Sequence, residues 1–273
     1  MKKRSKMMGS PKIPGVTLLE RCGFGTVSEV WLGIDRHQTL QAVRLVSKMR
    51  DPALLAMERR AMFWYRPLSG QHGNLMKILG SGENAGYLYS ITEPADNICG
   101  NSGRYEPDTL DRRLKSRKLT SAKILSCLED ILSGIRYLHN RNVSHGDLKP
   151  ENILFVGGVL KIGDPGLVGP ADRCCSAGTA GFRPPWNATG KECDIYAFGK
   201  LVYMLCTREN PQRFPEIPEQ CDLSAFMPLN EIALGCCESN PHRRFRDTDE
   251  ILRALKQVRI NSPTFRIQRC RAE

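Results

Sequence analysis

Residues 145–152 read HGDLKPEN, a stretch that brings a histidine, two acids, a lysine and an asparagine into eight positions. Two short apolar segments follow at 153–156 and 159–162, and the glycine pair between them is typical of a tight β-hairpin turn. Asp164 comes shortly after the second segment and begins an Asp-x-Gly tripeptide. This order of loop, hairpin and further carboxylate is too specific for an ordinary surface turn, so we interpret it as a functional centre.

The regions on either side of this stretch have helical periodicity. Upstream, apolar residues recur at helical spacing across 120–140, with Thr120 as a candidate N-cap. Downstream, the uniformly apolar segment 195–206 predicts a buried helix, and 229–238 and 248–258 predict two more. We therefore expect the second part of the chain to be a helical unit.

The first third of the chain has a strand-like pattern instead. The strand candidates lie in 16–47, with 40–46 as a separate short strand, and at 75–79 and 87–92. Between them, residues 52–65 predict a helix with Asp51 as its N-cap and Pro52 in its first turn. The predicted fold class is α+β, in which a mostly β unit with one helix precedes a helical unit.

The composition is that of a globular protein with a basic surface. The chain has 273 residues, 41% hydrophobic and 25% charged, and a formal net charge of +11. The basic residues form several separate clusters, at 1–6, 112–118, 243–246 and 266–273. No zinc-finger pattern, aromatic platform or basic helix repeat accompanies them. We therefore expect solvated faces and tails, and no nucleic-acid partner.

The cysteine content and the apolar segments indicate the cellular compartment in which we expect the protein. The chain has 11 cysteines, an odd number with no CxxC spacing, which favours reduced thiols over a zinc site or a disulfide framework. The N-terminal segment is basic but lacks the apolar core of a signal peptide, and no apolar run reaches the length of about 18 residues that spans a membrane. We expect a soluble, cytoplasmic protein without a membrane span.

The stretch 145–152, taken with Asp164-Pro165-Gly166, resembles the catalytic loop and the metal-binding loop of the eukaryotic-type (Hanks-type) Ser/Thr protein kinases. The resemblance covers about residues 16–258. It includes GTAGFRPP at 178–185, which is similar to the end of an activation segment, and DIYAFG at 194–199, which is similar to the start of a long buried helix. The implied fold is bilobal, with a small β-rich N-lobe that carries one helix and a larger helical C-lobe.

The resemblance also implies domain boundaries. The expected kinase domain is 13–258, between basic tails at 1–12 and 259–273. Within it the N-lobe is about 13–92, the hinge about 93–96 and the C-lobe about 97–258. Features at 155–159, 199–200 and 214–216 are most similar to bacterial members, of the kind found in planctomycetes and verrucomicrobia, which would make this a bacterial signalling protein.

The implied chemistry is phosphoryl transfer, which needs a positioned hydroxyl, a carboxylate to accept its proton and cations to balance the developing charge. By the family pattern Asp147 orients the acceptor hydroxyl and takes its proton. Lys149 contacts the transferring phosphate and indicates Ser/Thr rather than Tyr acceptors. Asn152 and Asp164 offer the oxygen ligands that Mg²⁺ prefers. His145 is expected to be structural.

The implied nucleotide site lies between the lobes, and the cofactors are ATP and Mg²⁺. A glycine-rich loop, with Ser28 in place of its third glycine, would cover the phosphates, since glycines let backbone amides approach phosphate oxygens closely. An apolar pair would line the adenine pocket, and the backbone of the hinge would bind the adenine edge. The implied ATP-binding positions are Gly23, Gly25, Ser28, Val30, Ala42, Arg44, Glu58, Glu93 and Ala95. The expected partners are ATP and a protein substrate with a Ser/Thr acceptor.

One of these positions departs from the family pattern. The segment QAVR at 41–44 has Arg44 where the family has a lysine that contacts the α- and β-phosphates and a helix glutamate. Glu58 is the single carboxylate of the helix predicted at 52–65, so we predict an Arg44–Glu58 ion pair. Arginine keeps the positive charge, but its planar fork is larger than an ammonium group and is aimed differently. Nucleotide binding with slow transfer is one consequence to test.

Three further departures bear on regulation and packing. Gly146 replaces an arginine that reads an activation-segment phosphate, so we expect no need for such phosphorylation. Pro165 replaces a phenylalanine whose packing switches other kinases. Trp186 stands where a glutamate would pair with Arg244, which predicts the loss of that ion pair, with the indole stacking on Arg244 or filling the gap.

The sequence leaves three hypotheses open. The first is an active Ser/Thr protein kinase, because no position of the catalytic and metal-binding set is lost. The second is a pseudokinase, a nucleotide-binding or scaffolding module with little or no transfer, and it is motivated by Arg44, Ser28, Pro165 and Trp186 together. The third is a kinase-fold enzyme that phosphorylates a small molecule, against which Lys149 and the 178–179 segment argue.

Overall fold

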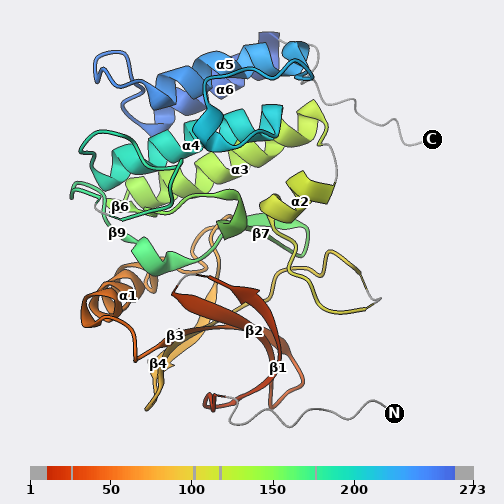
Figure 1. The fold of residues 1–273 in the computed structure, drawn as a ribbon, viewed down its shortest axis with the longest axis vertical. Helices are drawn as coiled ribbons and strands as arrows, with labels where there is room; N and C mark the ends of the chain where they lie inside the picture. The colour runs from red at the N-terminus through yellow and green to blue at the C-terminus, as the bar shows by residue number, and fades with distance from the viewer. Residues whose placement is uncertain (1–10, 26, 101–102, 117–118, 176, 262–273) are drawn as a thin grey trace.

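The computed structural model describes residues 11–25, 27–100, 103–116, 119–175 and 177–261. A β-sheet with one helix lies at one end of the molecule and a stack of helices lies at the other (Figure 1). This arrangement confirms the predicted α+β bilobal fold, and the two parts are called the N-lobe and the C-lobe below. The predicted basic tails lie for the most part outside the described residues.

The N-lobe is built on a five-stranded antiparallel sheet in the order β1-β2-β3-β5-β4. The strands are β1 (Val16–Phe24), β2 (Ser28–Asp35), β3 (Leu40–Ser47), β4 (Ile78–Glu83) and β5 (Tyr87–Thr92). Helix α1 (Pro52–Tyr65) connects β3 to β4, and the Asp51 carboxylate caps it by accepting the Ala53 N–H at 2.8 Å. The predicted helix and its N-cap are confirmed.

The strand predicted at 75–79 is wrong in its position, because β4 begins only at Ile78. Leu75 and Met76 are buried, with 0% and 4% exposure. Leu75 forms a single parallel bridge with Ile162, and the Met76 N–H donates to the Ile162 carbonyl at 3.0 Å. This apolar pair is therefore buried by contact between the N-lobe and a C-lobe hairpin, and not by membership of the sheet.

The C-lobe consists of helices with short strands between them (Figure 1). The helices are α2 (Leu110–Ser116), α3 (Ser121–His139), α4 (Gly190–Thr207), α5 (Leu223–Cys237) and α6 (Thr248–Asn261). The strands are β6 (Val143–Ser144), β7 (Ile153–Val156), β8 (Val159–Ile162) and β9 (Gly169–Pro170). Single 3₁₀ turns occur at Pro150–Asn152, Pro165–Leu167 and Pro211–Arg213. None of the helices in the described ranges is long and apolar enough to cross a membrane.

The C-lobe helices confirm the predicted pattern but differ at their ends. The Thr120 hydroxyl caps α3 by accepting the Lys123 N–H at 3.3 Å, as predicted. Helix α4 begins five residues before its predicted apolar segment, because Thr189 and Glu192 form a capping box ahead of that segment. Helix α5 likewise begins before 229. Helix α2 was not predicted.

The C-lobe core provides the rigid base for the loop at 145–152. Leu128 and Ile131 of α3, Phe155 of β7 and Phe198 of α4 each have 0% exposure and belong to one hydrophobic cluster. Burial of a side chain of this size contributes roughly 1.5–3 kcal/mol relative to leaving it in water. The loop is joined to this core through Leu148, which has 1% exposure and belongs to the same cluster.

Candidate active site

A cleft of about 490 Å³ lies between the two lobes. The site residues predicted from the sequence that line it are Gly23, Gly25, Ser28, Val30, Ala42, Arg44, Ala95, Lys149, Asn152 and Asp164. Glu58 and Asp147 lie behind this lining and contact Arg44 and Asn152, which belong to it, whereas Glu93 is not among the lining residues. The structure therefore brings the predicted nucleotide, metal and catalytic positions together around one cavity.

The loop at 145–152 is anchored from below by Asp194 in the first turns of α4. One Asp194 carboxylate oxygen accepts the His145 N–H at 2.8 Å, and the other accepts the Gly146 N–H at 2.8 Å. Asp194 has 0% exposure and also contacts His139 at 2.9 Å. The His145 ring contacts the Gly163 carbonyl at 2.8 Å, so it joins the loop to the segment that carries Asp164. Buried hydrogen bonds of this kind hold a loop in one conformation.

Gly146 has a backbone reason to be glycine. Its φ is +81°, and a Cβ at this position would lie 2.9 Å from the Leu167 carbonyl oxygen. An arginine here would carry both the strain of a left-handed conformation and a steric clash. The backbone conformation of the loop therefore explains why this position has glycine in place of the family's arginine.

Asp147 is the most densely bonded carboxylate of the site. Lys149 Nζ donates to its Oδ2 at 2.7 Å, and the Thr179 hydroxyl donates to its Oδ1 at 2.7 Å. The Thr179 backbone N–H adds a third donor at 3.1 Å, and Lys149 also contacts the Thr179 hydroxyl at 2.9 Å. Burial would raise the pKa of Asp147, but the hydrogen bonds from Lys149 and Thr179 outweigh it, and the pKa lies below its usual value. Asp147 is therefore ionised at neutral pH and held in one orientation.

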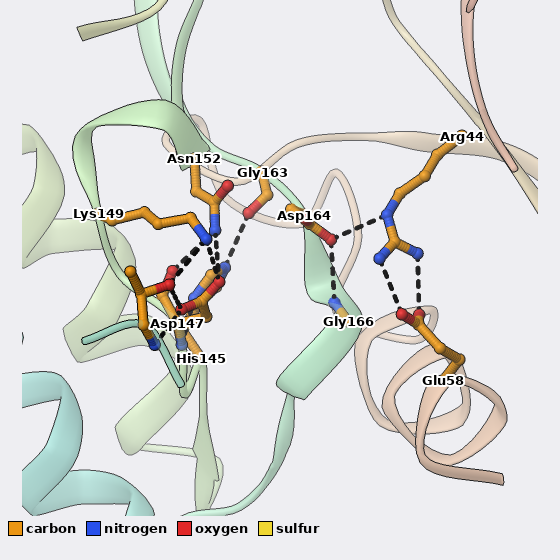
Figure 2. Close-up of polar contacts among 10 residues, drawn as sticks. Arg44, Glu58, His145, Asp147, Lys149, Asn152, Gly163, Asp164 and Gly166 are labelled. Atoms are coloured by element: carbon orange, nitrogen blue, oxygen red, sulfur yellow. Dashed lines mark hydrogen bonds and ion pairs between the residues drawn. The ribbon is translucent and has the colours of Figure 1, made fainter. Parts of the chain in front are cut away.

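Asn152 contacts this carboxylate, and the Asp164 carboxylate faces Arg44 and the Gly166 N–H (Figure 2). The Asn152 amide nitrogen donates to the Asp147 carbonyl at 2.8 Å and to its Oδ2 at 3.2 Å, which leaves the Asn152 side-chain oxygen as an available acceptor. Asp164 adopts the left-handed conformation (φ 52°, ψ 80°) ahead of the turn that begins with Pro165. No cluster of three or more His, Cys, Asp or Glu ligands occurs within the described ranges. An amide oxygen and a carboxylate suit a hard cation that also takes ligands from a phosphate.

The predicted Arg44–Glu58 ion pair is present. The two terminal nitrogens of Arg44 donate to the two carboxylate oxygens of Glu58, each at 2.8 Å, in a bidentate fork (Figure 2). The Arg44 Nε lies 3.1 Å from Asp164 Oδ1 but is not aligned for a hydrogen bond with it. Burial would lower the pKa of Arg44, but the charges of Asp164 and Glu58 raise it above its usual value. The Arg44–Asp164 contact was not predicted.

The hinge positions make contacts that the sequence did not indicate. The Glu93 carboxylate accepts the Lys77 N–H at 3.0 Å and the Lys161 ammonium at 2.5 Å, so this side chain joins the lobes instead of facing the cleft. The Ala95 carbonyl accepts the Tyr105 hydroxyl at 2.9 Å. In the described part of the chain, the Ala95 N–H has no partner. Of the two Ala95 backbone groups, the N–H is therefore the one left to bind a ligand.

The predicted loss of an ion pair at Arg244 is wrong. Glu192, from the capping box of α4, pairs with Arg244 in place of the residue at 186. The guanidinium of Arg244 also lies 4.7 Å from the ring centre of Trp186, which confirms the predicted stacking. Because Glu192 precedes the apolar part of α4, the sequence pattern gave no reason to pair it with a residue 52 positions away.

Comparison with known proteins shows the family. A profile of the protein kinase domain matches residues 16–258, and the chain belongs to the protein kinase family. The calcium/calmodulin-dependent protein kinase cmkB of Emericella nidulans is 29% identical over 205 residues, which cover 67% of this chain and 47% of that protein. A probable serine/threonine-protein kinase of Clostridium acetobutylicum is 26% identical over 272 residues, which cover 89% of this chain and 39% of that protein.

A third relative is described as not active. The inactive serine/threonine-protein kinase PLK5 of Mus musculus is 39% identical over 105 residues, which cover 35% of this chain and 18% of that protein. The chain thus spans less than half the length of these relatives. They come from a fungus, a bacterium and a mammal, so the resemblance to bacterial members stays a prediction.

Proposed function

We propose that this chain is a protein serine/threonine kinase that uses ATP and Mg²⁺ to phosphorylate protein hydroxyls. The observation that carries the proposal is the position of Asp147, ionised and held by Lys149 and Thr179 beside the cleft between the lobes. The Clostridium acetobutylicum relative is named a probable serine/threonine-protein kinase, which supports the same acceptor class.

Each residue around Asp147 has a role in this proposal. Asp147 orients the acceptor hydroxyl and accepts its proton as the oxygen attacks the γ-phosphate. Lys149 stabilises the negative charge of the transferring phosphate. Thr179 fixes both side chains, because its hydroxyl lies within hydrogen-bonding distance of each.

Asn152 and Asp164 are the proposed magnesium ligands, and their oxygen donors fit that ion. When bound, Mg²⁺ neutralises charge on the phosphates and thereby favours transfer. The backbone N–H of Ala95 is the proposed donor to the adenine edge, while Val30 and Ala42 line the cleft as its apolar surface.

A pseudokinase is the second candidate, and the bonds of Arg44 favour it. Its two terminal nitrogens donate to Glu58 and its Nε faces Asp164. All three guanidinium nitrogens are therefore directed at carboxylates and not at the phosphates of a nucleotide. A lysine at this position would have a single ammonium with donors to spare for phosphate. If Arg44 restrains transfer, Arg44→Lys raises the rate, whereas in a competent enzyme the substitution changes it little.

The deciding experiment combines the purified chain with Mg²⁺, γ-labelled ATP and a generic protein acceptor, beside an Asp147→Asn blank. Label on serine or threonine that depends on Asp147 supports the kinase. Label that appears only on a small-molecule acceptor would support the third hypothesis. No transfer above the blank, together with retained binding of ATP, would establish the pseudokinase.

A further inference from the structure

Two cysteine side chains meet where the segment between β9 and α4 packs on α4. Cys174 bridges to Thr189, the N-cap of α4, and the Cys175 N–H donates to the Ala188 carbonyl at 2.9 Å. The Cys193 N–H donates to the Thr189 carbonyl at 2.9 Å, which places Cys193 in the first turn of α4. The side chains of Cys175 and Cys193 interact with each other, and the Cys175 thiol also donates to the Ala177 carbonyl at 3.2 Å.

The two thiols differ in exposure and in acidity. Cys175 is half-buried, whereas Cys193 has 5% exposure. The hydrogen bond from Cys193 lowers the pKa of Cys175 to about 7, against the opposing effect of burial, and Arg183 lowers it further while Asp194 raises it. The same hydrogen bond and burial raise the pKa of Cys193. Cys175 is therefore the more acidic thiol of the pair, and part of its population is ionised at neutral pH.

Four other cysteines are less acidic than Cys175. Burial raises the pKa of Cys22 to about 11, and it also raises the pKa of Cys127, Cys206 and Cys236. Cys174 is exposed and precedes Cys175 directly in the sequence. An accessible thiolate next to a second thiol is the arrangement that oxidants attack selectively.

We propose that Cys175 and Cys193 are a site of oxidation by hydroperoxides, which joins them in a disulfide that fastens the segment carrying Thr179 to α4. In the first step the Cys175 thiolate attacks hydrogen peroxide, so that an S–O bond forms, the O–O bond breaks and a water molecule leaves after protonation. In the second step the Cys193 sulfur attacks the Cys175 sulfenic acid, so that the S–S bond forms and the hydroxyl leaves with the Cys193 proton as a second water. One peroxide is reduced for each disulfide formed.

The disulfide would retain the present arrangement, because the two thiols are already in contact. Cys175 lies four residues before Thr179, whose hydroxyl and N–H bond to Asp147. Fastening Cys175 to α4 removes freedom from the unfolded chain and from open forms of this segment. Oxidation is thus expected to raise Tm by several degrees and to slow hydrogen exchange at 171–182. These readouts do not depend on phosphoryl transfer, so they stand or fail separately from the proposed function.

The test treats the reduced, full-length chain with a small excess of hydrogen peroxide and then blocks free thiols with an alkylating agent. Trypsin cleaves after Arg173, Lys191 and Lys200 and cuts poorly at Arg183, which precedes a proline. The expected product is fragment 174–191 linked to fragment 192–200, with the mass of two hydrogens lost, and dithiothreitol separates the two. Because the first fragment holds both Cys174 and Cys175, the matched control is Cys174→Ser, which should keep the link, whereas Cys175→Ser should lose it.

A second variant and a second measurement keep the proposal open to refutation. At the buried position the variant is Cys193→Ala, because a serine hydroxyl there could unfold the site. Hydrogen exchange is measured on the unmodified chain and therefore needs no substitution. A link that survives in Cys175→Ser, or one that joins two chains, would overturn the proposal. So would peroxide that oxidises the exposed Cys174 while Cys175 and Cys193 both stay reduced.

Discussion

Arg44 makes one contact that was predicted, with Glu58, and one that was not, with Asp164. The family resemblance implied a helix glutamate as the partner of residue 44, and Glu58 was the candidate because α1 has a single carboxylate. The approach of its Nε to Asp164 depends on how the lobes close, and no local pattern encodes that closure. The same holds for Asp194, whose contacts with His145 and Gly146 join segments 49 and 48 positions apart.

At this scale we predict that Arg44→Lys lowers the free energy of unfolding by about 2 kcal/mol. The lysine ammonium can replace only one of the two hydrogen bonds that Arg44 donates to Glu58. The other Glu58 oxygen then lacks a donor, although the side chain has only 7% exposure. The measurement is urea denaturation of the chain without nucleotide.

Arg59→Lys is the matched control for this prediction. Arg59 lies on the same helix and forms the same kind of fork with Glu83, but both side chains are exposed, at 48% and 39%. Its replacement should cost less than about 0.5 kcal/mol. Equal losses in the two variants would show that burial of the Arg44 fork contributes nothing.

The acidity of Cys175 gives a second residue-scale prediction, on pH. Because its pKa is lowered to about 7, its alkylation rate in the folded chain should reach half its maximum near that pH and fall as the thiol protonates below it. In the unfolded chain the half-maximum should move to about 8.5, the value of a free cysteine. The rate of iodoacetamide labelling in the Cys174→Ser variant, folded and in urea, measures both. Identical profiles in the two states would contradict the shift.

At the scale of elements, segments with a clear period or a clear turn signal were predictable. Helix α3, with its Thr120 cap, agrees closely with the prediction because its period persists over 19 residues. The short strands β7 and β8 were predictable from the glycine pair that joins them. Helix α2 is only seven residues long and is rich in charge, so it has no periodic apolar face to detect. The apolar residues at 75–76 gave a false strand because contact between the lobes, and not a sheet, buries them.

The start of α4 gives the prediction that belongs to this scale. Glu192 closes the capping box with Thr189 and also pairs with Arg244, whose side chain has 7% exposure. Glu192→Ala removes both interactions and leaves a buried cation, so the expected loss in unfolding free energy is about 3 kcal/mol. Urea denaturation measures it.

Glu250→Ala serves as the comparison for Glu192→Ala. Glu250 pairs with Arg246, whose side chain has 80% exposure, so its removal should cost less than about 1 kcal/mol. If the Glu192 variant is no less stable than the Glu250 variant, the pair between Glu192 and Arg244 does not anchor the start of α4.

At the scale of the whole molecule, named polar contacts join the two lobes. Glu93 binds Lys161 of β8, Arg44 faces Asp164, and Met76 bonds to Ile162. A ligand that fills the cleft touches both lobes and binds only the folded chain, so it should raise Tm in proportion to its occupancy. This response separates nucleotide binding from transfer, which the activity assay alone cannot do.

The last prediction uses that response to locate the adenine. MgATP at about a hundred times its Kd should add about 2.7 kcal/mol to the stability of the native chain, or roughly 5–10 °C in Tm. Ala42 lines the cleft, so Ala42→Leu fills the space proposed for the base and should abolish the shift while leaving the Tm without ligand nearly unchanged. Ala53→Leu, at an exposed position in the first turn of α1, is the matched control and should keep the full shift. A shift that persists in Ala42→Leu would mean that the nucleotide binds elsewhere, and a native chain with no shift would mean that Arg44 and its neighbours have closed the site to ATP.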